Sequence, residues 1–110
     1  MPSLLPRPAF IAAANARIAW LAENRSEKQL DSFLSGLADV RRRLDQSPEA
    51  GPPLRSSDAH VLRMRLFPRP LPYLVYYGHR RERPLMEIYL IRLYGSGQDR
   101  EDFDMSQWPW

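Results

Sequence analysis

The stretch HVLRMRLF at residues 60–67 decides the fold prediction, because it opens a run of three strand-like segments. Its apolar residues and its arginines alternate with a period of two, which places them on opposite faces of a strand. Two further segments follow, PYLVYYG at residues 72–78 and LMEIYLIRLY at residues 85–94. The last is apolar on both faces, as expected of a central or covered strand. We therefore predict strands at 60–67, 72–78 and 85–94.

Two helical patterns precede these strands. In residues 9–24 an apolar stripe recurs at helical spacing, formed by Phe10, Ala14, Ile18 and Leu21. In residues 27–46 a longer stripe is formed by Leu30, Phe33, Leu34, Leu37, Val40 and Leu44. The short link between the two segments favours an antiparallel helical hairpin.

The remaining segments complete a predicted α+β fold. Leu4 and Leu5 indicate a short first strand at residues 1–6. Prolines and a glycine at residues 48–53 predict a loop, because proline suits neither a helix interior nor a central strand. We predict one domain over residues 1–110, in which the helical hairpin packs on a small, mainly antiparallel sheet. Residues 95–110 form a tail across or beside that sheet.

Composition narrows the functional classes. The 110 residues contain no cysteine, and His60 and His79 lie far apart without metal-ligand spacing, so we predict neither a metal site nor a cofactor. No apolar run reaches the length of a membrane span. The first 22 residues resemble a signal peptide in their alanines, but Pro6, Arg7 and Pro8 interrupt any hydrophobic centre. We therefore expect a cytoplasmic protein that does not contact a membrane.

Charge is distributed unevenly along the chain. Residues 55–92 carry eight arginines against three acidic residues, a net charge of +5, whereas residues 93–110 carry a net charge of −3. A positive sheet followed by an acidic tail indicates an anionic partner, or a tail that folds back onto its own sheet. Phe103, Trp108 and Trp110 in the tail fit both interpretations, because packing on the sheet and anchoring a partner bury the same side chains.

No motif of a known catalytic class is present. The sequence lacks a glycine-rich phosphate loop, a Gly-x-Ser-x-Gly elbow and a metal-binding motif. The remaining chemistry is that of arginine and tyrosine on a sheet face, which either binds phosphate or stabilises charge that develops on it.

Several motifs, in order, resemble the RelE/ParE superfamily of toxins from type II toxin–antitoxin modules. Residues 44–51 are similar to the family's L-x-x-x-P-x-x-G ending of the second helix, and Leu54-Arg55 is similar to its LR before the next strand. Residues 72–77 match its PY-hydrophobic-hydrophobic-Y strand, and residues 88–99 resemble its closing strand and HG-x-RD ending. The resemblance covers nearly the whole chain and implies the fold predicted above.

The chain departs from the family pattern at three positions. Tyr94 stands where the family often has histidine, Gln98 where it often has arginine, and Gly78 where an arginine commonly follows the strand tyrosine. The lysine-rich loop and the terminal histidine or tyrosine of some nuclease members are missing. We therefore assign no catalytic residue. For a nuclease, the resemblance implies a set consisting of Arg63, Arg65, Arg92 and Tyr94.

The resemblance implies a toxin that a cognate antitoxin neutralises by direct binding. Antitoxins of such modules commonly dimerise, which implies a heterotetramer. The favoured mechanism is ParE-like binding to DNA gyrase. A RelE-like endoribonuclease that cuts mRNA on the ribosome, and a non-toxic binding module, stay open as alternatives. Candidate residues for binding the target or the antitoxin lie in the sheet, the tail and the first helix: Arg63, Arg65, Tyr77, Arg92, Tyr94, Gln98, Phe103, Trp108, Trp110 and Trp20.

Overall fold

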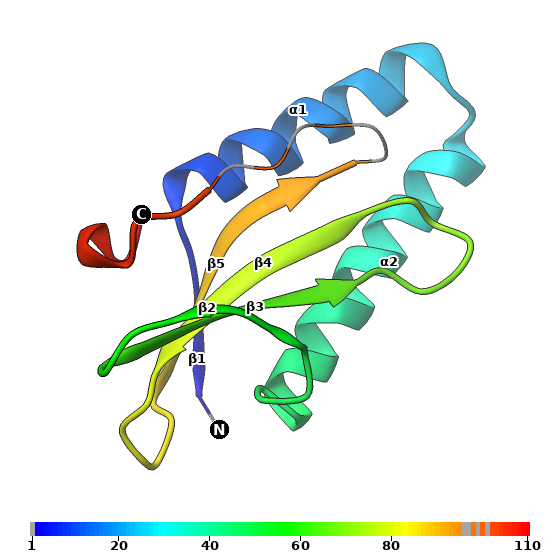
Figure 1. The fold of residues 1–110 in the computed structure, drawn as a ribbon. Helices are drawn as coiled ribbons and strands as arrows, with labels where there is room; N and C mark the ends of the chain where they lie inside the picture. Colours follow the sequence, from blue (N-terminus) through cyan, green and yellow to red (C-terminus); the bar gives the residue numbers. More distant parts are fainter. Residues whose placement is uncertain (1, 96–97, 99, 101) are drawn as a thin grey trace.

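In the computed structural model, which describes residues 2–95, 98, 100 and 102–110, the chain forms an α+β fold of two helices and a five-stranded sheet (Figure 1). The elements follow in this order: β1 (Ser3–Pro6), α1 (Pro8–Asn24), α2 (Glu27–Gln46), β2 (Pro53–Ser56), β3 (His60–Leu66), β4 (Leu74–Arg80), β5 (Glu87–Tyr94) and a short 3-10 helix (Met105–Gln107). The predicted order of a short strand, a helical hairpin and then consecutive strands is confirmed.

The sheet is mixed, with the strand order β1-β5-β4-β3-β2. β1 pairs in parallel with β5, in a register that places Leu4 opposite Ile88. The other three pairings are antiparallel. The register between β4 and β5 shifts after Tyr76, which pairs with Arg92, because the next pair is Tyr77 with Leu90. This bulge interrupts the alternation of β5.

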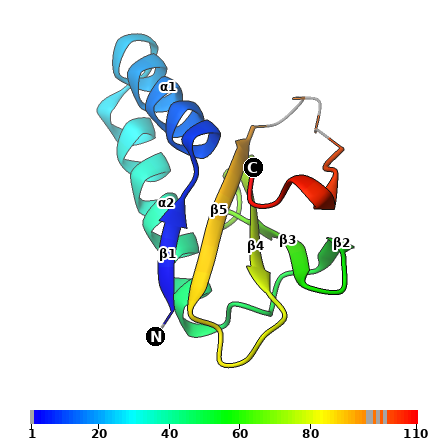
Figure 2. The same ribbon diagram turned by 90° about the vertical axis from the view of Figure 1, so that its left-hand side faces the viewer.

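Each face of the sheet carries its own apolar cluster. The two helices cover one face, and the C-terminal tail lies over the other (Figure 2). The helix-side cluster includes Phe10, Leu21, Phe33, Val40, Leu44, Val75, Tyr77 and Ile88. The tail-side cluster includes Leu62, Leu74, Tyr76, Tyr89, Ile91, Tyr94 and Phe103. The predicted tail across the sheet is therefore present, and it buries a face that the helices leave uncovered.

The helical stripes pack largely as their spacing predicts. Phe10, Ala14 and Leu21 of α1 are buried, and Phe33, Val40 and Leu44 of α2 are buried opposite them. Leu34 is the exception, with 42 % of its surface exposed. Phe33, Leu37 and Val40 follow one another at intervals of four and three residues and so share one face of α2. Leu34 lies beside this face, next to Phe33 in the sequence, and is therefore only partly covered.

Some strand boundaries differ from the prediction, most clearly around β2 and β4. The predicted loop of residues 48–53 runs into an extra strand, β2, whose four residues are all exposed. Proline is tolerated there because β2 is an edge strand, which does not need every N–H group. The predicted strand 72–78 begins later, at Leu74, and continues through His79 to Arg80, which pairs with His60. The segment that connects it to the next strand lies two residues later than predicted, because β5 begins at Glu87 rather than at residue 85.

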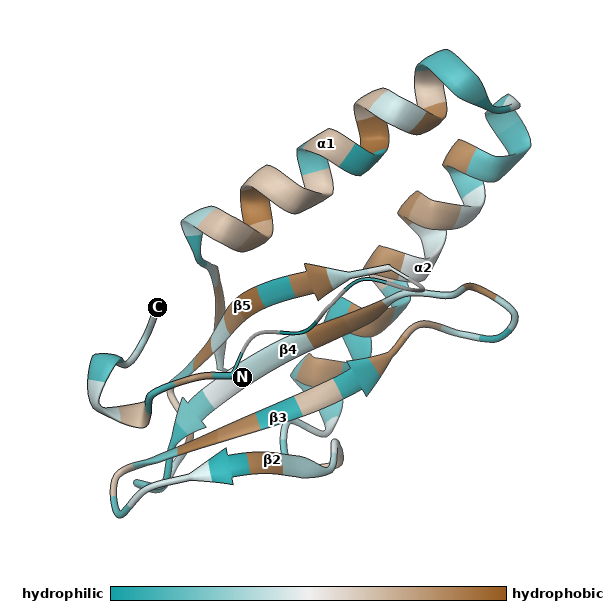
Figure 3. Ribbon diagram, turned by 45° about the horizontal axis from the view of Figure 1, so that its top comes forward, coloured by the Kyte–Doolittle hydropathy of each residue, from teal (hydrophilic) through white to brown (hydrophobic). Residues whose placement is uncertain are grey.

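The hydropathy of the elements matches these layers. Hydrophobic residues, drawn in brown, run along β3, β4 and β5, whereas the turn between α1 and α2 is hydrophilic (Figure 3). Neither helix is both long enough and apolar enough to cross a membrane, within the described part of the chain.

Candidate functional site

The sheet register divides the four residues of the predicted nuclease set between two faces. Arg63 pairs with Tyr77 and Arg65 with Val75, and both partners belong to the helix-side cluster. Tyr94, in contrast, packs in the tail-side cluster with Tyr76, the cross-strand partner of Arg92. Directly opposite residues share a face of a sheet, so the two pairs of side chains point in opposite directions.

Arg63 is engaged in a network within its own domain. Its side chain is 14 % exposed. Nη1 donates a hydrogen bond to the carbonyl oxygen of Gly51 over 2.9 Å, and Nε donates to Nε2 of His79 over 3.0 Å. Glu49, which also pairs with Arg83, lies 3.9 Å from Nη2 of Arg63. Arg63 thus fastens the loop before β2 to the sheet.

His79 and Tyr77 complete this network. Nδ1 of His79 lies 2.8 Å from the carbonyl oxygen of Arg80, so that nitrogen carries the proton and Nε2 accepts from Arg63. Burial lowers the pKa of His79, and the charge of Arg63 acts in the same direction. Tyr77 is fully buried, and its hydroxyl accepts a hydrogen bond from the N–H of Gly51 over 3.1 Å. Burial raises the pKa of Tyr77.

Tyr77 was predicted to bind a partner, but in the structure it is buried in the core. None of its area is exposed, and its hydroxyl is used inside the core. The strand motif that contains it fits a buried position equally well, because tyrosine carries a large apolar ring and one polar group that seeks a partner.

Arg92 and Tyr94 lie together on the tail side. The Arg92 guanidinium lies 5.2 Å from the ring centre of Phe103, and its Nη1 donates to the carbonyl oxygen of Ile91 over 2.9 Å. The rings of Tyr94 and Tyr76 meet edge to face at 5.0 Å. Tyr94 and Phe103 are both buried, so the tail covers this group of side chains.

Trp108 and Trp110 extend the same cover. The Trp108 ring stacks on His60 at 4.5 Å and meets Tyr89 edge to face at 5.5 Å. Trp110 lies 4.8 Å from Phe103 and 5.5 Å from Trp108, centre to centre. The predicted binding residues of the tail therefore pack on their own sheet.

Two polar contacts hold the tail as well. Asp102 pairs with Arg55 of β2. Asp104 accepts hydrogen bonds from the N–H and the hydroxyl of Ser106, which lower the pKa of Asp104 and cap the 3-10 helix.

A basic pocket lies on the helix side, between the end of α2 and β3. It has a volume of about 270 Å³ and is lined by Arg42, Arg43, Gln46, Ser47 and Arg65. Asp39 pairs with both Arg42 and Arg43, and its distance to Nε of Arg43 is 2.8 Å. Arg65 has no carboxylate within ion-pair distance among the residues that the structure describes. Positive charge therefore exceeds negative charge around this pocket, which we call the basic pocket.

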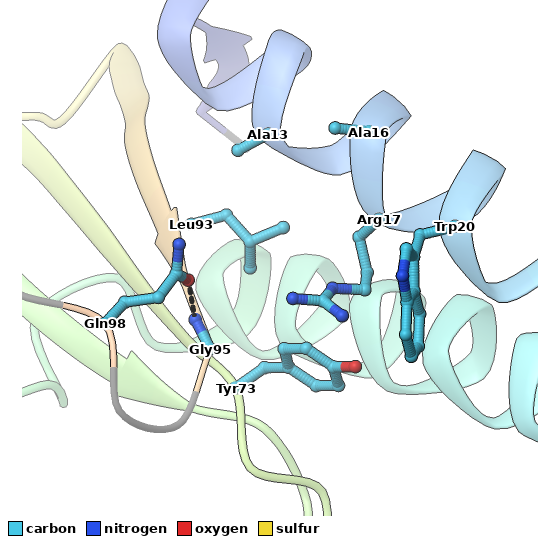
Figure 4. A pocket seen from close by; sticks show the side chains of 8 residues that line it. All are labelled: Ala13, Ala16, Arg17, Trp20, Tyr73, Leu93, Gly95 and Gln98. Carbon is cyan, nitrogen blue, oxygen red and sulfur yellow. Dashed lines mark hydrogen bonds between the residues drawn. The ribbon is translucent and has the colours of Figure 1, made fainter. Parts of the chain in front are cut away.

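A second pocket lies between α1 and the ends of β4 and β5 (Figure 4). Its volume is about 330 Å³, and its lining consists of Ala13, Ala16, Arg17, Trp20, Tyr73, Leu93, Gly95 and Gln98. The Arg17 side chain points into the space between Tyr73 and Trp20. Gln98, a predicted binding residue, accepts a hydrogen bond from the N–H of Gly95 at the rim.

No protein-family model matches the chain, and no curated protein matches it. Within the described residues, no group of three or more histidine, aspartate or glutamate side chains is arranged to hold a metal ion.

Sequence reasoning missed Arg17, Arg25 and Tyr73 as surface residues of interest. Arg17 and Trp20 are three residues apart on a predicted helix, which places them side by side and was a usable signal. Tyr73 was assigned to a strand, and only the tertiary fold brings it next to α1.

Proposed function

We propose that this protein is the toxin of a type II toxin–antitoxin module and inhibits growth in the cytoplasm by binding its target, with DNA gyrase as the expected target. The agreement between the observed fold and the fold that the sequence resemblance implies supports the family. The resemblance supplies the antitoxin and the target.

The division of the nuclease set between the two sheet faces is the observation that favours binding over cutting. A nuclease needs its proton-transferring group and its charge-stabilising groups around one phosphate, within hydrogen-bond distance of the reacting atoms. Here Arg63 is occupied by Gly51 and His79, on the face opposite to Tyr94. Arg65, by contrast, lines the basic pocket, where it is suited to an anionic surface.

A RelE-like nuclease is the alternative, and one observation favours it. Arg92, Tyr76 and Tyr94 form a compact group beneath the tail, and arginine with tyrosine is the combination that stabilises a charged phosphate. In this alternative the tail must leave the sheet before RNA reaches these groups, because Phe103 lies over Arg92.

Two assays on the purified protein separate these functions. The first measures supercoiling by DNA gyrase, and the second measures cleavage of mRNA on translating ribosomes. We expect loss of supercoiling without mRNA cleavage, and partial recovery of supercoiling with Arg65→Ala but not with the control Arg41→Ala. Ribosome-dependent cleavage with normal supercoiling establishes the alternative. Normal growth on induced expression without an antitoxin excludes both toxin functions and leaves a non-toxic binding module.

A further inference from the structure

The basic pocket continues into a larger pocket beside it. This second pocket has a volume of about 430 Å³, and Arg43 and Arg65 line both pockets, so the two adjoin. The second pocket is otherwise lined by Pro52, Met64, Leu66, Phe67, Pro68 and Arg69. We call the two adjoining pockets together the arginine groove.

Four guanidinium groups from three separate segments line the arginine groove. Arg42 and Arg43 lie near the end of α2. Arg65 belongs to β3, and Arg69 follows β3 in the connection to β4. No carboxylate side chain is among the described residues of the lining. The fold therefore gathers positive charge from distant parts of the sequence into one groove.

Little of this charge is neutralised by the protein itself. Asp39 pairs with Arg42 and lies 2.8 Å from Nε of Arg43, but its side chain is only 19 % exposed. The side chains of Arg42 and Arg43 are 60 % and 47 % exposed, so both guanidinium groups still reach the solvent. Arg65 and Arg69 have no carboxylate within ion-pair distance in the part of the chain that the structure describes. One negative charge thus stands against four positive charges.

Several arginines along one groove are suited to a chain of phosphates. The planar guanidinium donates two parallel N–H groups to a single phosphate and stays charged at physiological pH. A nucleic-acid backbone presents regularly spaced negative charges to all four arginines at once, and each contact releases a bound counterion. Two adjoining pockets with shared arginines therefore match a phosphodiester backbone better than a single small anion.

The apolar part of the lining favours a duplex over a single strand. Proteins that bind single strands stack the bases on accessible aromatic rings. Phe67 is the only aromatic residue among the described residues of the lining, and it is 3 % exposed because it packs on Phe33 and Tyr73. The arginine groove thus offers contacts to phosphates but no platform for unstacked bases.

We propose that the arginine groove binds the phosphate backbone of duplex DNA without reading its sequence. Arg43 and Arg65 contact the central phosphate, because they lie where the two pockets meet. Arg42 and Arg69 contact the phosphates on either side. The binding itself goes beyond the proposed function and does not depend on it. The proposed function supplies only one source of the duplex, since DNA gyrase acts on DNA.

Fluorescence anisotropy tests this binding with the full-length chain and a labelled duplex of about 20 base pairs, between about 50 and 200 mM salt. For Arg65→Gln/Arg69→Gln we expect a dissociation constant at least about fivefold higher than that of the wild type, and a salt dependence whose slope is smaller by about two. The loss is the same for a second duplex of unrelated sequence, because phosphate contacts carry no sequence information. The control Arg25→Gln/Arg41→Gln removes two charges outside the groove and stays within about twofold of the wild type.

Two competitors identify the occupant. One is a single-stranded RNA of the same length, and the other is poly-L-glutamate at the same concentration of charge. We expect both to displace the labelled duplex less effectively than unlabelled duplex does. A competitor that displaces it equally well overturns the assignment to duplex DNA. The site itself is overturned if the wild type does not bind the duplex, or if Arg65→Gln/Arg69→Gln binds it as tightly as the control variant.

The failure of this site and the failure of the proposed function are distinguishable. Duplex binding that Arg65→Gln/Arg69→Gln weakens, by a chain that leaves supercoiling unaffected, supports the groove and overturns the proposed function. Inhibition of supercoiling by a chain that does not bind the duplex overturns the groove and leaves the proposed function intact. Circular dichroism and thermal unfolding verify the fold of each variant. Arg69→Glu, a single change at an exposed position, repeats the test if the double variant does not fold.

Discussion

Trp108 lies so close to Gly78 that a Cβ atom at position 78 would come within 2.2 Å of its ring. The same Cβ would lie 3.0 Å from the carbonyl oxygen of Val61. Both contacts favour glycine at position 78, and the lack of a side chain there lets the indole rest on the sheet and stack on His60.

Gly78→Ala tests this contact. We expect the substitution to displace Trp108 and to lower the free energy of unfolding by about 1–3 kcal/mol, the usual effect of overpacking. Urea unfolding measures the stability, and near-ultraviolet circular dichroism follows the indole. In the double variant with Trp108→Phe, the smaller ring relieves the clash, so the two effects are less than additive. Additive effects show that the contact does not constrain position 78.

Tyr77→Phe removes the acceptor for the N–H group of Gly51. Because the hydroxyl is buried, the N–H loses its partner without gaining water, and we expect a loss of about 1–3 kcal/mol in the free energy of unfolding. Tyr73→Phe is the matched control, since no hydrogen bond of the Tyr73 hydroxyl is found among the residues that the structure describes. Equal stability of the two variants contradicts a structural role for the Tyr77 hydroxyl.

We expect the free energy of unfolding to decrease as the pH falls below about 6.5, the ordinary pKa of histidine. Burial lowers the pKa of His79 in the folded chain, so the unfolded chain binds the proton more readily. The contribution of His79 is fully present above pH 6.5 and is lost as the pH falls towards its folded-state pKa. We expect His79→Gln to flatten the pH dependence of the free energy of unfolding by up to about 1.4 kcal/mol per pH unit, the limit for one proton.

His60→Gln is the comparison for this measurement. Partial burial and the charge of Arg80 also lower the pKa of His60, so its removal acts in the same direction. His60 is half-buried whereas His79 is 1 % exposed, so we expect the smaller change for His60. Unchanged slopes between pH 7.5 and 5.5 in His79→Gln show that the histidine is not held neutral.

Arg63 and Arg65, two residues apart, respond differently to substitution. Arg63→Ala leaves the carbonyl oxygen of Gly51 and Nε2 of His79 without their donor, and we expect a loss of about 1–3 kcal/mol in stability. Arg65→Ala removes a charge from the basic pocket and changes stability by less than about 0.5 kcal/mol. Thermal unfolding with the supercoiling assay resolves the two roles. If Arg65→Ala lowers stability but still inhibits supercoiling like the wild type, then Arg65 has a structural role and does not bind the target.

Phe103→Ala loosens the tail. Phe103 is 5 % exposed and packs on Tyr76, Trp110 and the guanidinium of Arg92. Truncating a buried phenylalanine removes apolar contacts and leaves a cavity, so we expect a loss of about 3 kcal/mol and increased binding of a hydrophobic dye to the exposed sheet face. Gln107→Ala, at an exposed position of the same tail, leaves both readouts unchanged. Wild-type dye binding by Phe103→Ala contradicts the tail as a cover.

The architecture was predictable because its signals are local. The helical stripe through Phe10 and Leu21 and the alternation through residues 60–67 each report which side of an element is buried. β2 was missed because an exposed edge strand of four residues, one of them Pro53, has no apolar alternation to detect.

The arrangement of the candidate site was not predictable for a different reason. Alternation shows which residues of one strand share a face, but relating Arg63 to Arg92 needs the register across β4. The bulge beside Arg92 shifts that register by one residue, and a shift of one residue exchanges the faces. The position of the tail also could not be predicted, because it depends on the space that Gly78 leaves for the Trp108 ring, and these residues are far apart in the sequence.

The parallel pairing of β1 with β5 determines when during synthesis this fold is completed. Leu4 is made well before its partner Ile88, because the two helices and three other strands lie between them in the sequence. The helical hairpin therefore leaves the ribosome long before the central strand on which it packs, and contacts between such distant segments form slowly. A chain interrupted before Glu87 presents the hairpin with its apolar stripes uncovered, because these stripes pack on the sheet that β5 completes.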